Sequence, residues 1–281
     1  MNHNMHILIA TMLAASVGGF AHAQDQDQKV DRVTVELTDP SQPASLEVGL
    51  VNGGIKVTGY DGKTVIVEAT TRLKKIGKSK EETGKSAGMT RIGINSSSLT
   101  VEEYKNKVEI GTDSWANPVD LVIKVPKRTS LALSCVNSGD IHVENITGDI
   151  EASNINGVVT LLNITGSAVA SAHNGNCTVT FAAVDPEKDM AFSSFSGDVD
   201  VTFPASLKAK VKLKTVQGDI FTDFEIVQIE NPEEVIKENR RDSGGKYTIK
   251  IDRAYWGTIN GGGQEIQFSN YNGDIYIRKQ K

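Results

Sequence analysis

Five acidic residues directly follow a glycine, and regularly spaced carboxylates could supply the oxygen ligands of a calcium site. These acids are Asp140, Asp149, Asp198, Asp219 and Asp274. A calcium cage needs several oxygens converging on one ion, and the nonapeptide repeats that bind calcium carry a double glycine that is missing here. We therefore expect the acids to hydrogen-bond within their own turns and to hold no metal.

Cysteine and histidine side chains could bind zinc or form a nucleophile and its general base. The candidates are Cys135, His142, His173 and Cys177. Their spacing matches no zinc-finger pattern, and the repeat described below places Cys177 and His173 inward and His142 outward. We therefore expect no metal, no cofactor and no catalytic residues.

Aromatic and basic side chains supply candidates for binding a partner. A flat aromatic patch would favour protein binding, whereas seven basic residues between positions 72 and 91 could attract a polyanion. The candidate partner-binding residues are Tyr255, Trp256, Tyr271, Arg72, Lys74 and Lys75.

Five consecutive nonapeptides between residues 136 and 180 form a repeat. A glycine stands in the fourth place of each, and we interpret it as a structural turn residue that supplies a positive φ. Repetition at a fixed period is typical of solenoids, because a unit this short buries its apolar side only by stacking on its neighbours. The turn glycines are Gly139, Gly148, Gly157, Gly166 and Gly175.

Strand alternation predicts that the second, sixth and eighth places of each unit face inward. These places hold Ile146, Ile155 and Ile164, then Ile141, Ile150 and Val159, then Val143, Ala152 and Leu161. Further copies begin at residues 50, 59, 194, 215 and 270. The sequence therefore predicts an all-β, parallel β-solenoid with about two nine-residue units per coil, three units being the alternative, and a β-rich N-terminal part.

Two segments interrupt the pattern. Residues 72–94 lack apolar periodicity, so we expect a mobile loop there. Residues 225–246 form a charged insertion, and capping signals at Asn231 and Pro232 with a stop at Gly244 predict a short helix.

The N-terminus predicts export. Residues 1–23 combine a short apolar stretch with Ala21-His22-Ala23, the small-x-small pattern of signal-peptide cleavage. We expect residues 24–281 to form one solenoid domain with no membrane span.

The net charge of −5 argues against nucleic-acid binding. Cys135 and Cys177 should remain free thiols, because two coils between them exceed the reach of a disulfide.

Residues 119–170 resemble the bacterial envelope family of β-strand-repeat proteins labelled putative adhesins, a domain of unknown function. The similarity extends over about residues 45–279 and includes the closing segment INGGGQEIQFSNYNGDIYIRK. This resemblance implies a right-handed, β-helix-like domain exported to the periplasm or cell surface. It implies no catalytic residues.

These observations predict a non-catalytic cell-envelope binding scaffold whose partner is an envelope protein or a surface glycan. One alternative is a periplasmic envelope-stress or signalling accessory that binds another envelope protein. A second is a carbohydrate-active enzyme, because parallel solenoids also host polysaccharide-cleaving enzymes. The repetition of the Gly-Asp acids already has a structural cause and does not by itself favour the enzyme.

Overall fold

The computed structural model describes residues 30–72, 98–112, 117–230, 234–239, 247–252 and 254–281. Every regular element within these ranges is a strand, which confirms the all-β prediction. None of the described residues forms a helix long and apolar enough to cross a membrane. The predicted signal peptide and residues 73–94 of the predicted loop lie outside the described residues.

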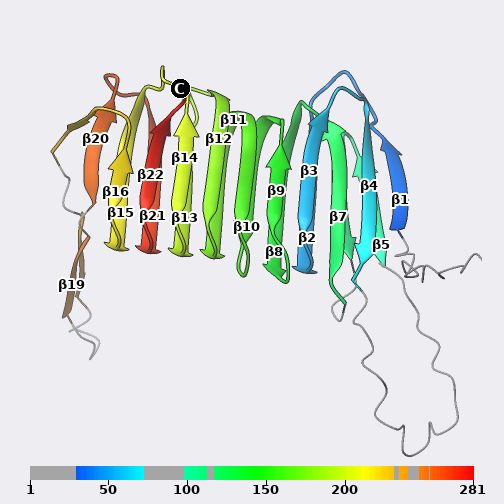
Figure 1. The fold of residues 1–281 in the computed structure, drawn as a ribbon, viewed down its shortest axis with the longest axis horizontal. Coiled ribbons are helices and arrows are strands. Elements are labelled where there is room, and N and C mark those ends of the chain that lie inside the picture. Colours follow the sequence, from blue (N-terminus) through cyan, green and yellow to red (C-terminus); the bar gives the residue numbers. More distant parts are fainter. Residues whose placement is uncertain (1–29, 73–97, 113–116, 231–233, 240–246, 253) are drawn as a thin grey trace, which may run out of the picture.

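The chain winds into a long, flattened coil whose strands form two facing walls (Figure 1). The first wall reads, in spatial order, β5 (Leu99–Tyr104), β6 (Lys107–Thr112), β2 (Ala44–Asn52), β8 (Thr129–Asn137), β10 (Thr147–Asn154), the second half of β11 (Val159–Asn174), β13 (Met190–Ser196), β21 (Gln264–Asn272), β15 (Ala209–Gln217), β20 (Tyr255–Ile259) and β17 (Ile226–Gln228).

The second wall has its own order of strands. It reads β1 (Val30–Glu36), β4 (Thr64–Thr71), β7 (Val119–Pro126), β3 (Ile55–Tyr60), β9 (Ile141–Glu144), the first half of β11, β12 (Cys177–Val184), β14 (Val199–Phe203), β22 (Ile275–Lys279) and β16 (Ile220–Thr222).

Stacking in the centre of the coil is parallel and follows the nonapeptides in pairs. Thr147 pairs with Thr165 in the first wall, and Val159 pairs with Cys177 in the second, an offset of 18 residues in both. The offset equals two nonapeptides. One unit therefore crosses one wall, and the next unit crosses the other.

The C-terminal repeat lies out of sequence order. Strand β21 pairs with β13 on one side and β15 on the other, and β22 lies likewise between β14 and β16. The chain thus leaves a gap after residue 203, builds the next coil beyond it, and returns to fill the gap (Figure 1). This insertion brings residues near 195, 271 and 216 into neighbouring coils.

Antiparallel strands cover parts of both ends of the stack. Strands β1 and β4 close one end of the second wall, and β20 and β17 extend the first wall beyond β15 at the other end. Covering strand edges is a common protection against edge-to-edge aggregation.

The space between the walls is filled by apolar side chains from both. Small aliphatic residues fill the centre of the coil, whereas Phe181, Phe192, Phe203 and Phe268 fill its C-terminal part. Phe181 and Phe203 stack with ring centroids 5.2 Å apart. Aromatic rings of this kind bury a large apolar area, so we expect these coils to be the most stable part of the stack.

The predicted inward places are correct with one exception among the nine residues. Ile155 is 44% exposed, whereas the preceding Asn154 is 1% exposed. Successive units cross opposite walls and turn at opposite edges, so the alternation of side chains shifts by one residue at every second turn. His173 is exposed for the same reason, and its predicted inward orientation is wrong.

The turn glycines are required mainly by close packing between coils. Among the five predicted turn glycines, only Gly166 has a φ in the left-handed region, so our explanation by positive φ is wrong for the other four. A Cβ on Gly157 would lie 2.3 Å from the carbonyl oxygen of Gly139, and a Cβ on Gly148 would lie 2.7 Å from that of Thr129. Backbone atoms of the neighbouring coil therefore exclude a side chain.

The helix predicted within residues 225–246 is wrong. Strand β18 (Glu234–Asn239) lies there, and it pairs antiparallel with β19 (Tyr247–Asp252), so that Val235 is opposite Ile251. β-Branched residues favour strands, so pairing with a neighbouring strand outweighs the helix-capping signals. The predicted strand over residues 246–252 is confirmed by β19.

Candidate binding edge

The chain passes from the first wall to the second through a short turn at one edge of the coil, which we call the glycine edge. It contains Gly139, Gly157, Gly175, Gly197, Gly273 and Gly218, stacked in this order. A Cβ on Gly273 would lie 2.3 Å from the carbonyl oxygen of Gly197. Because each of these glycines packs against the turn of the neighbouring coil, the residues beside the turns line up in rows.

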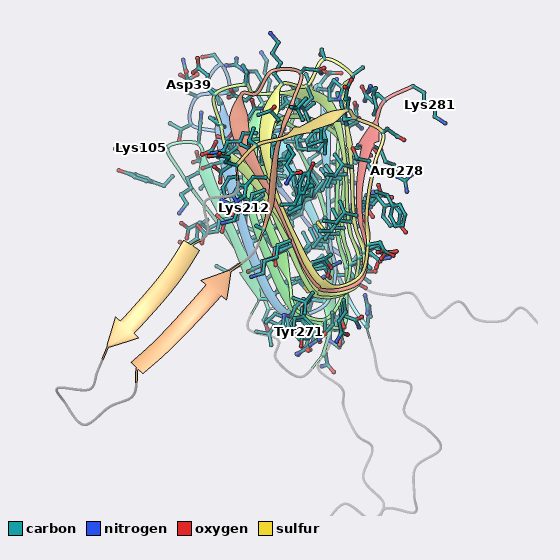
Figure 2. The ribbon with its side chains drawn as sticks, turned by 90° about the vertical axis from the view of Figure 1, so that its left-hand side faces the viewer. Asp39, Lys105, Lys212, Tyr271, Arg278 and Lys281 are labelled. Carbon is teal, nitrogen blue, oxygen red and sulfur yellow. The ribbon has the colours of Figure 1, made fainter. Side chains whose placement is uncertain are left out.

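A row of apolar and aromatic residues runs along this edge, and we call it the apolar ridge. Strand register places its members side by side in neighbouring coils, and all but the half-buried Val136 are exposed. The ridge consists of Val51, Val136, Ile155, His173, Phe195, Tyr271 and Val216. Figure 2 shows Tyr271 at this edge, with Lys212 and Arg278 on the two walls.

The rings of the ridge stack directly on one another. The centroids of Phe195 and Tyr271 lie 4.6 Å apart, and those of His173 and Phe195 lie 4.8 Å apart. Interplanar angles of 6° and 13° make both pairs parallel. The rings therefore cover each other's faces and turn their edges to solvent, which suits packing against apolar groups better than stacking on a sugar ring.

Buried polar residues fix the orientation of the ridge. The residue before each ridge member points inward, and several of these donate a hydrogen bond to a glycine carbonyl of the neighbouring coil. Asn154 Nδ2 donates to Gly139 at 3.0 Å, and Asn270 Nδ2 donates to Gly197 at 2.8 Å. With one neighbour held inside, the next side chain must point out.

The residues after the ridge form ladders of amides. Asn156 Nδ2 donates to Asn137 Oδ1 at 2.7 Å, and Asn174 Nδ2 donates to Asn156 Oδ1 at 2.8 Å. These hydrogen bonds run from coil to coil and hold the turns in register.

The acids that follow the turn glycines form a second row, which we call the acid row. Asp198 Oδ1 accepts the backbone N–H of Asp274 at 2.9 Å, and Asp274 Oδ1 accepts that of Asp219 at 2.8 Å. Asp140 accepts the N–H of Val158 in the same way. Our prediction that these acids bond within their own turns is wrong for Asp140, Asp198 and Asp274, because the backbone N–H that each accepts lies in the next coil.

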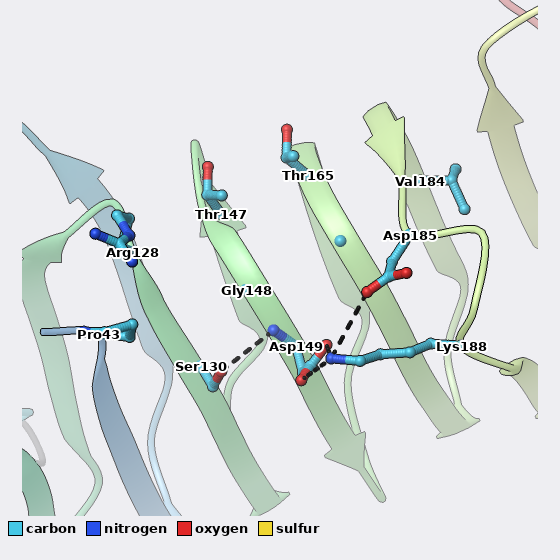
Figure 3. A pocket seen from close by; sticks show the side chains of 11 residues that line it. Pro43, Arg128, Ser130, Thr147, Gly148, Asp149, Thr165, Val184, Asp185 and Lys188 are labelled. Atoms are coloured by element: carbon cyan, nitrogen blue, oxygen red, sulfur yellow. Dashed lines mark hydrogen bonds and ion pairs between the residues drawn. The ribbon is translucent and has the colours of Figure 1, made fainter.

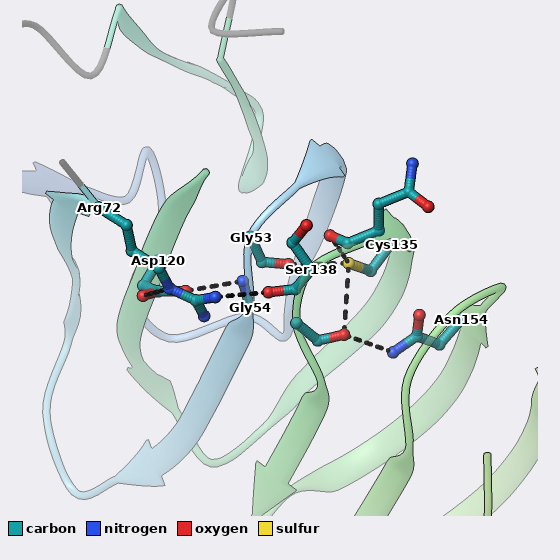
Figure 4. Close-up of polar contacts among 9 residues, drawn as sticks. Gly53, Gly54, Arg72, Asp120, Cys135, Ser138 and Asn154 are labelled. Carbon is teal, nitrogen blue, oxygen red and sulfur yellow. Dashed lines mark hydrogen bonds and ion pairs between the residues drawn. The ribbon is translucent and has the colours of Figure 1, made fainter. Parts of the chain in front are cut away.

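The two ends of the acid row differ in charge. Near the N-terminal end, Arg72 Nη2 lies 2.5 Å from Asp120, and Nη1 donates to the carbonyl of Ser138 at 2.6 Å (Figure 4). The Asp120 carboxylate raises the pKa of the Arg72 guanidinium. Near the C-terminal end, in the part of the chain that the structure describes, Asp198, Asp219 and Asp274 form no ion pair with a lysine or arginine.

The structure separates the predicted partner-binding aromatics. Tyr271 belongs to the apolar ridge, whereas Trp256 lies in the first wall and is buried. The Nζ atoms of Lys210 and Lys212 lie over its ring, 4.6 and 5.1 Å from the ring centroid. Tyr255 pairs with Leu213, away from the turn, and is 38% exposed. The three residues therefore do not form the single flat patch that we considered.

The basic candidates also differ from expectation. The guanidinium of Arg72 is occupied by Asp120 and Ser138, which gives it a structural role. Lys74 and Lys75 lie outside the described residues.

The zinc candidates are scattered. Cys135 lies in the first wall and Cys177 in the second; both thiols are free and buried. His142 contacts Glu144 on the outside of the second wall, and His173 lies in the ridge. Among the described residues, no group of histidines, cysteines and acids could hold a metal ion.

A shallow pocket of about 390 Å³ lies near the opposite edge of the coil (Figure 3). Lys188 crosses the pocket, and its Nζ lies 2.7 Å from Asp149 Oδ2. This contact lowers the pKa of the Asp149 carboxyl. The pocket's charged groups are thus largely paired with each other, and it has no aromatic wall.

The sequence contained a signal for the ridge that we missed. In six of the seven coils the ridge residue stands two places before the turn glycine, and each of them is aliphatic, aromatic or histidine. Val136 stands one place further away because Ser138, with a φ of 66°, is inserted there.

Fold and edge together define an all-β repeat protein with a continuous apolar surface row. The Toastrack DUF4097 family model matches residues 137–278, half of the chain, and the chain belongs to this family. No curated protein matches.

Two solved structures are similar to the chain. One is a putative cell adhesion protein from Clostridium sporogenes, 12% identical, with a TM-score of 0.43, covering 90% of this chain and 100% of that one. The other is a putative adhesin from Bacteroides fragilis, 14% identical, with a TM-score of 0.33, covering 90% of this chain and 97% of that one.

Proposed function

We propose that the protein is an exported, non-catalytic binding scaffold of the bacterial cell envelope, and that the glycine edge holds its partner. The single observation that carries this proposal is the apolar ridge. Outward positions of a solenoid need no apolar residue for folding, yet seven consecutive coils place one, or a histidine, at the same point. A contiguous exposed apolar surface of this kind is typical of an interaction site.

The geometry of the edge supports a docking role. Each ridge residue is held by the strand that carries it, and the ladders of amides and acids fix the turns. A preorganised surface loses little conformational entropy when a partner binds. Export and location in the envelope rest on the signal-like residues 1–23.

The test compares two variants that remove equal kinds of exposed rings. The mature protein, labelled with a fluorophore, is incubated with envelope fractions of its source organism. The test variant is Phe195→Ser with Tyr271→Ser. The control is Tyr104→Ser with Tyr255→Ser, which removes two exposed rings of the first wall that lie away from the glycine edge.

We expect the wild type and the control to bind alike and the ridge variant to lose about tenfold in affinity, because two interface rings contribute more than about 1.4 kcal/mol together. Circular dichroism must show that both variants are folded. Equal binding by the folded ridge variant and the control would refute the role of the ridge.

A further inference from the structure

We propose that the partner segment held by the glycine edge is a cationic amphipathic helix. Its apolar side would lie on Phe195, Tyr271 and Val216, and its basic side chains on the acid row. This inference rests on the proposed function and names the chemistry of the partner.

The same three coils supply both halves of this surface. Phe195 and Asp198 belong to one turn, Tyr271 and Asp274 to the next, and Val216 and Asp219 to the third. Within each turn, the acid stands three positions after the ridge member, with two residues between them. Neighbouring strands lie about 4.8 Å apart, so the surface consists of two parallel rows with that spacing.

Like charges lie close together in this row, and among the described residues the three carboxylates have no lysine or arginine partner. Each of Asp198 and Asp274 uses one oxygen for the N–H of the next coil, and Tyr276 Oη donates to Asp274 Oδ2 at 3.1 Å. No ion pair neutralises them in the described part of the chain, although the nearby Asp200 is paired with Arg278 at 2.8 Å. Cationic side chains would relieve this repulsion.

A metal ion fits this row less well than a series of ammonium or guanidinium groups. The carboxylates stand in line along the coil, and their hydrogen bonds fix Oδ1 of Asp198 and Asp274 toward the backbone. A cation cage needs oxygens around one point, whereas side chains of a partner can approach each acid separately.

The spacing favours a helix over an extended strand. One face of a helix presents side chains about every 5.4 Å along its axis, close to the row spacing of about 4.8 Å. An extended strand presents them about every 6.8 Å, twice its rise per residue. The backbone groups of the edge are already paired between coils, so strand addition is not available there.

The test uses a fluorescein-labelled peptide of about 14 residues, or about four helical turns, in which leucine and lysine follow the helical period. Fluorescence anisotropy measures its binding to the mature protein at low and at physiological salt. A second peptide carries glutamate at every lysine position. Sedimentation velocity shows whether the protein itself occupies the edge by pairing with a second copy.

The charge variant is Asp198→Asn with Asp219→Asn and Asp274→Asn. It keeps the ladder, because Asn176 Oδ1 already accepts the N–H of Asp198 at 2.9 Å in the wild type. The matched control removes three exposed acids elsewhere through Glu36→Gln, Glu102→Gln and Glu151→Gln. The two variants have the same net charge.

We expect the lysine peptide to bind the wild type and the control alike, more weakly as salt rises, and to lose about tenfold in affinity on the charge variant. The ridge variant, Phe195→Ser with Tyr271→Ser, should also bind the lysine peptide more weakly. The inference would be overturned if the lysine peptide bound both triple variants with equal affinity, if the glutamate peptide bound the wild type as tightly as the lysine peptide, or if the lysine peptide did not bind at all. A stable dimer that covers the edge would also overturn it. If the ridge variant still loses envelope binding in that case, the proposed function stands and only the cationic partner is wrong.

Discussion

Phe195 of β13 and Tyr271 of β21 stack in parallel with their ring centroids 4.6 Å apart, although one strand precedes and the other follows the charged insertion. They meet only because the C-terminal repeat inserts between two earlier coils. The aromatic part of the ridge therefore depends on the return of the chain. A double-mutant cycle with Phe195→Ala and Tyr271→Ala should give a coupling energy of about 0.5–1.5 kcal/mol in chemical unfolding. Additive effects of the two changes would mean that the rings do not interact in solution.

The turn glycines predict a sharp contrast between two identical substitutions. Gly157→Ala places a Cβ 2.3 Å from the backbone carbonyl oxygen of Gly139 in the neighbouring coil, and side-chain atoms of Asn154 and Asp140 lie within 2.8 Å of it. We expect a loss of about 1–3 kcal/mol in the free energy of unfolding. Gly111→Ala is the control, because none of the described residues has an atom within 4 Å of its Cβ position, its two chain neighbours aside. Similar stabilities of the two variants would contradict the close packing of the coils.

The acid row predicts that replacing an aspartate by asparagine costs little stability, whereas replacing it by alanine destabilises the fold. Asp198→Asn keeps an acceptor for the N–H of Asp274, and Asp198→Ala leaves that N–H without its partner. We expect the alanine variant to be less stable than the asparagine variant by about 1 kcal/mol in urea unfolding. An asparagine variant that is as unstable as the alanine variant would show that the charge itself holds the turn.

Cys177 predicts a dependence of stability on alkaline pH. Burial raises the pKa of its thiol from 9.0 to about 12, so the folded state keeps a proton that the unfolded state loses above pH 9. The unfolded state then binds fewer protons, and the free energy of unfolding falls with rising pH, by at most about 1.4 kcal/mol per pH unit.

The measurement compares the wild type with Cys177→Ala between pH 8 and pH 10.5, the range in which the thiol of the unfolded chain, with its pKa near 9.0, loses its proton. The difference in stability between the two proteins should shrink as the pH rises. Alkylation in denaturant should modify both Cys135 and Cys177, since both are free thiols in the structure. A constant difference across this range would show that the thiol is not buried as described.

The repeat could be read from the sequence because glycine spacing and apolar alternation agree within each unit. Strands over residues 119–126 and 246–252 followed from the same patterns. The place of residues 264–279 could not be read, because their motif fits any coil equally well and only the packing of complete coils decides between positions.

The candidate edge could be predicted only in part. Tyr271 was chosen for its ring, but Phe195 and His173 were missed because one alternation was applied to every unit. Units turn at two edges, and the buried Asn154 and Asn270 reverse the orientation at one of them. The acids were seen, yet their partners in the next coil depend on stacking that no single unit reveals.

Site-specific photo-crosslinking tests the docking role of the glycine edge most directly. A photoreactive phenylalanine analogue replaces Tyr271 in one variant and Tyr104, an exposed residue near the opposite edge of the coil, in another. Both proteins are irradiated with envelope fractions. The docking proposal predicts a discrete crosslinked species from position 271 that is absent from position 104. Crosslinks of equal yield from both positions, or from position 104 alone, would contradict it.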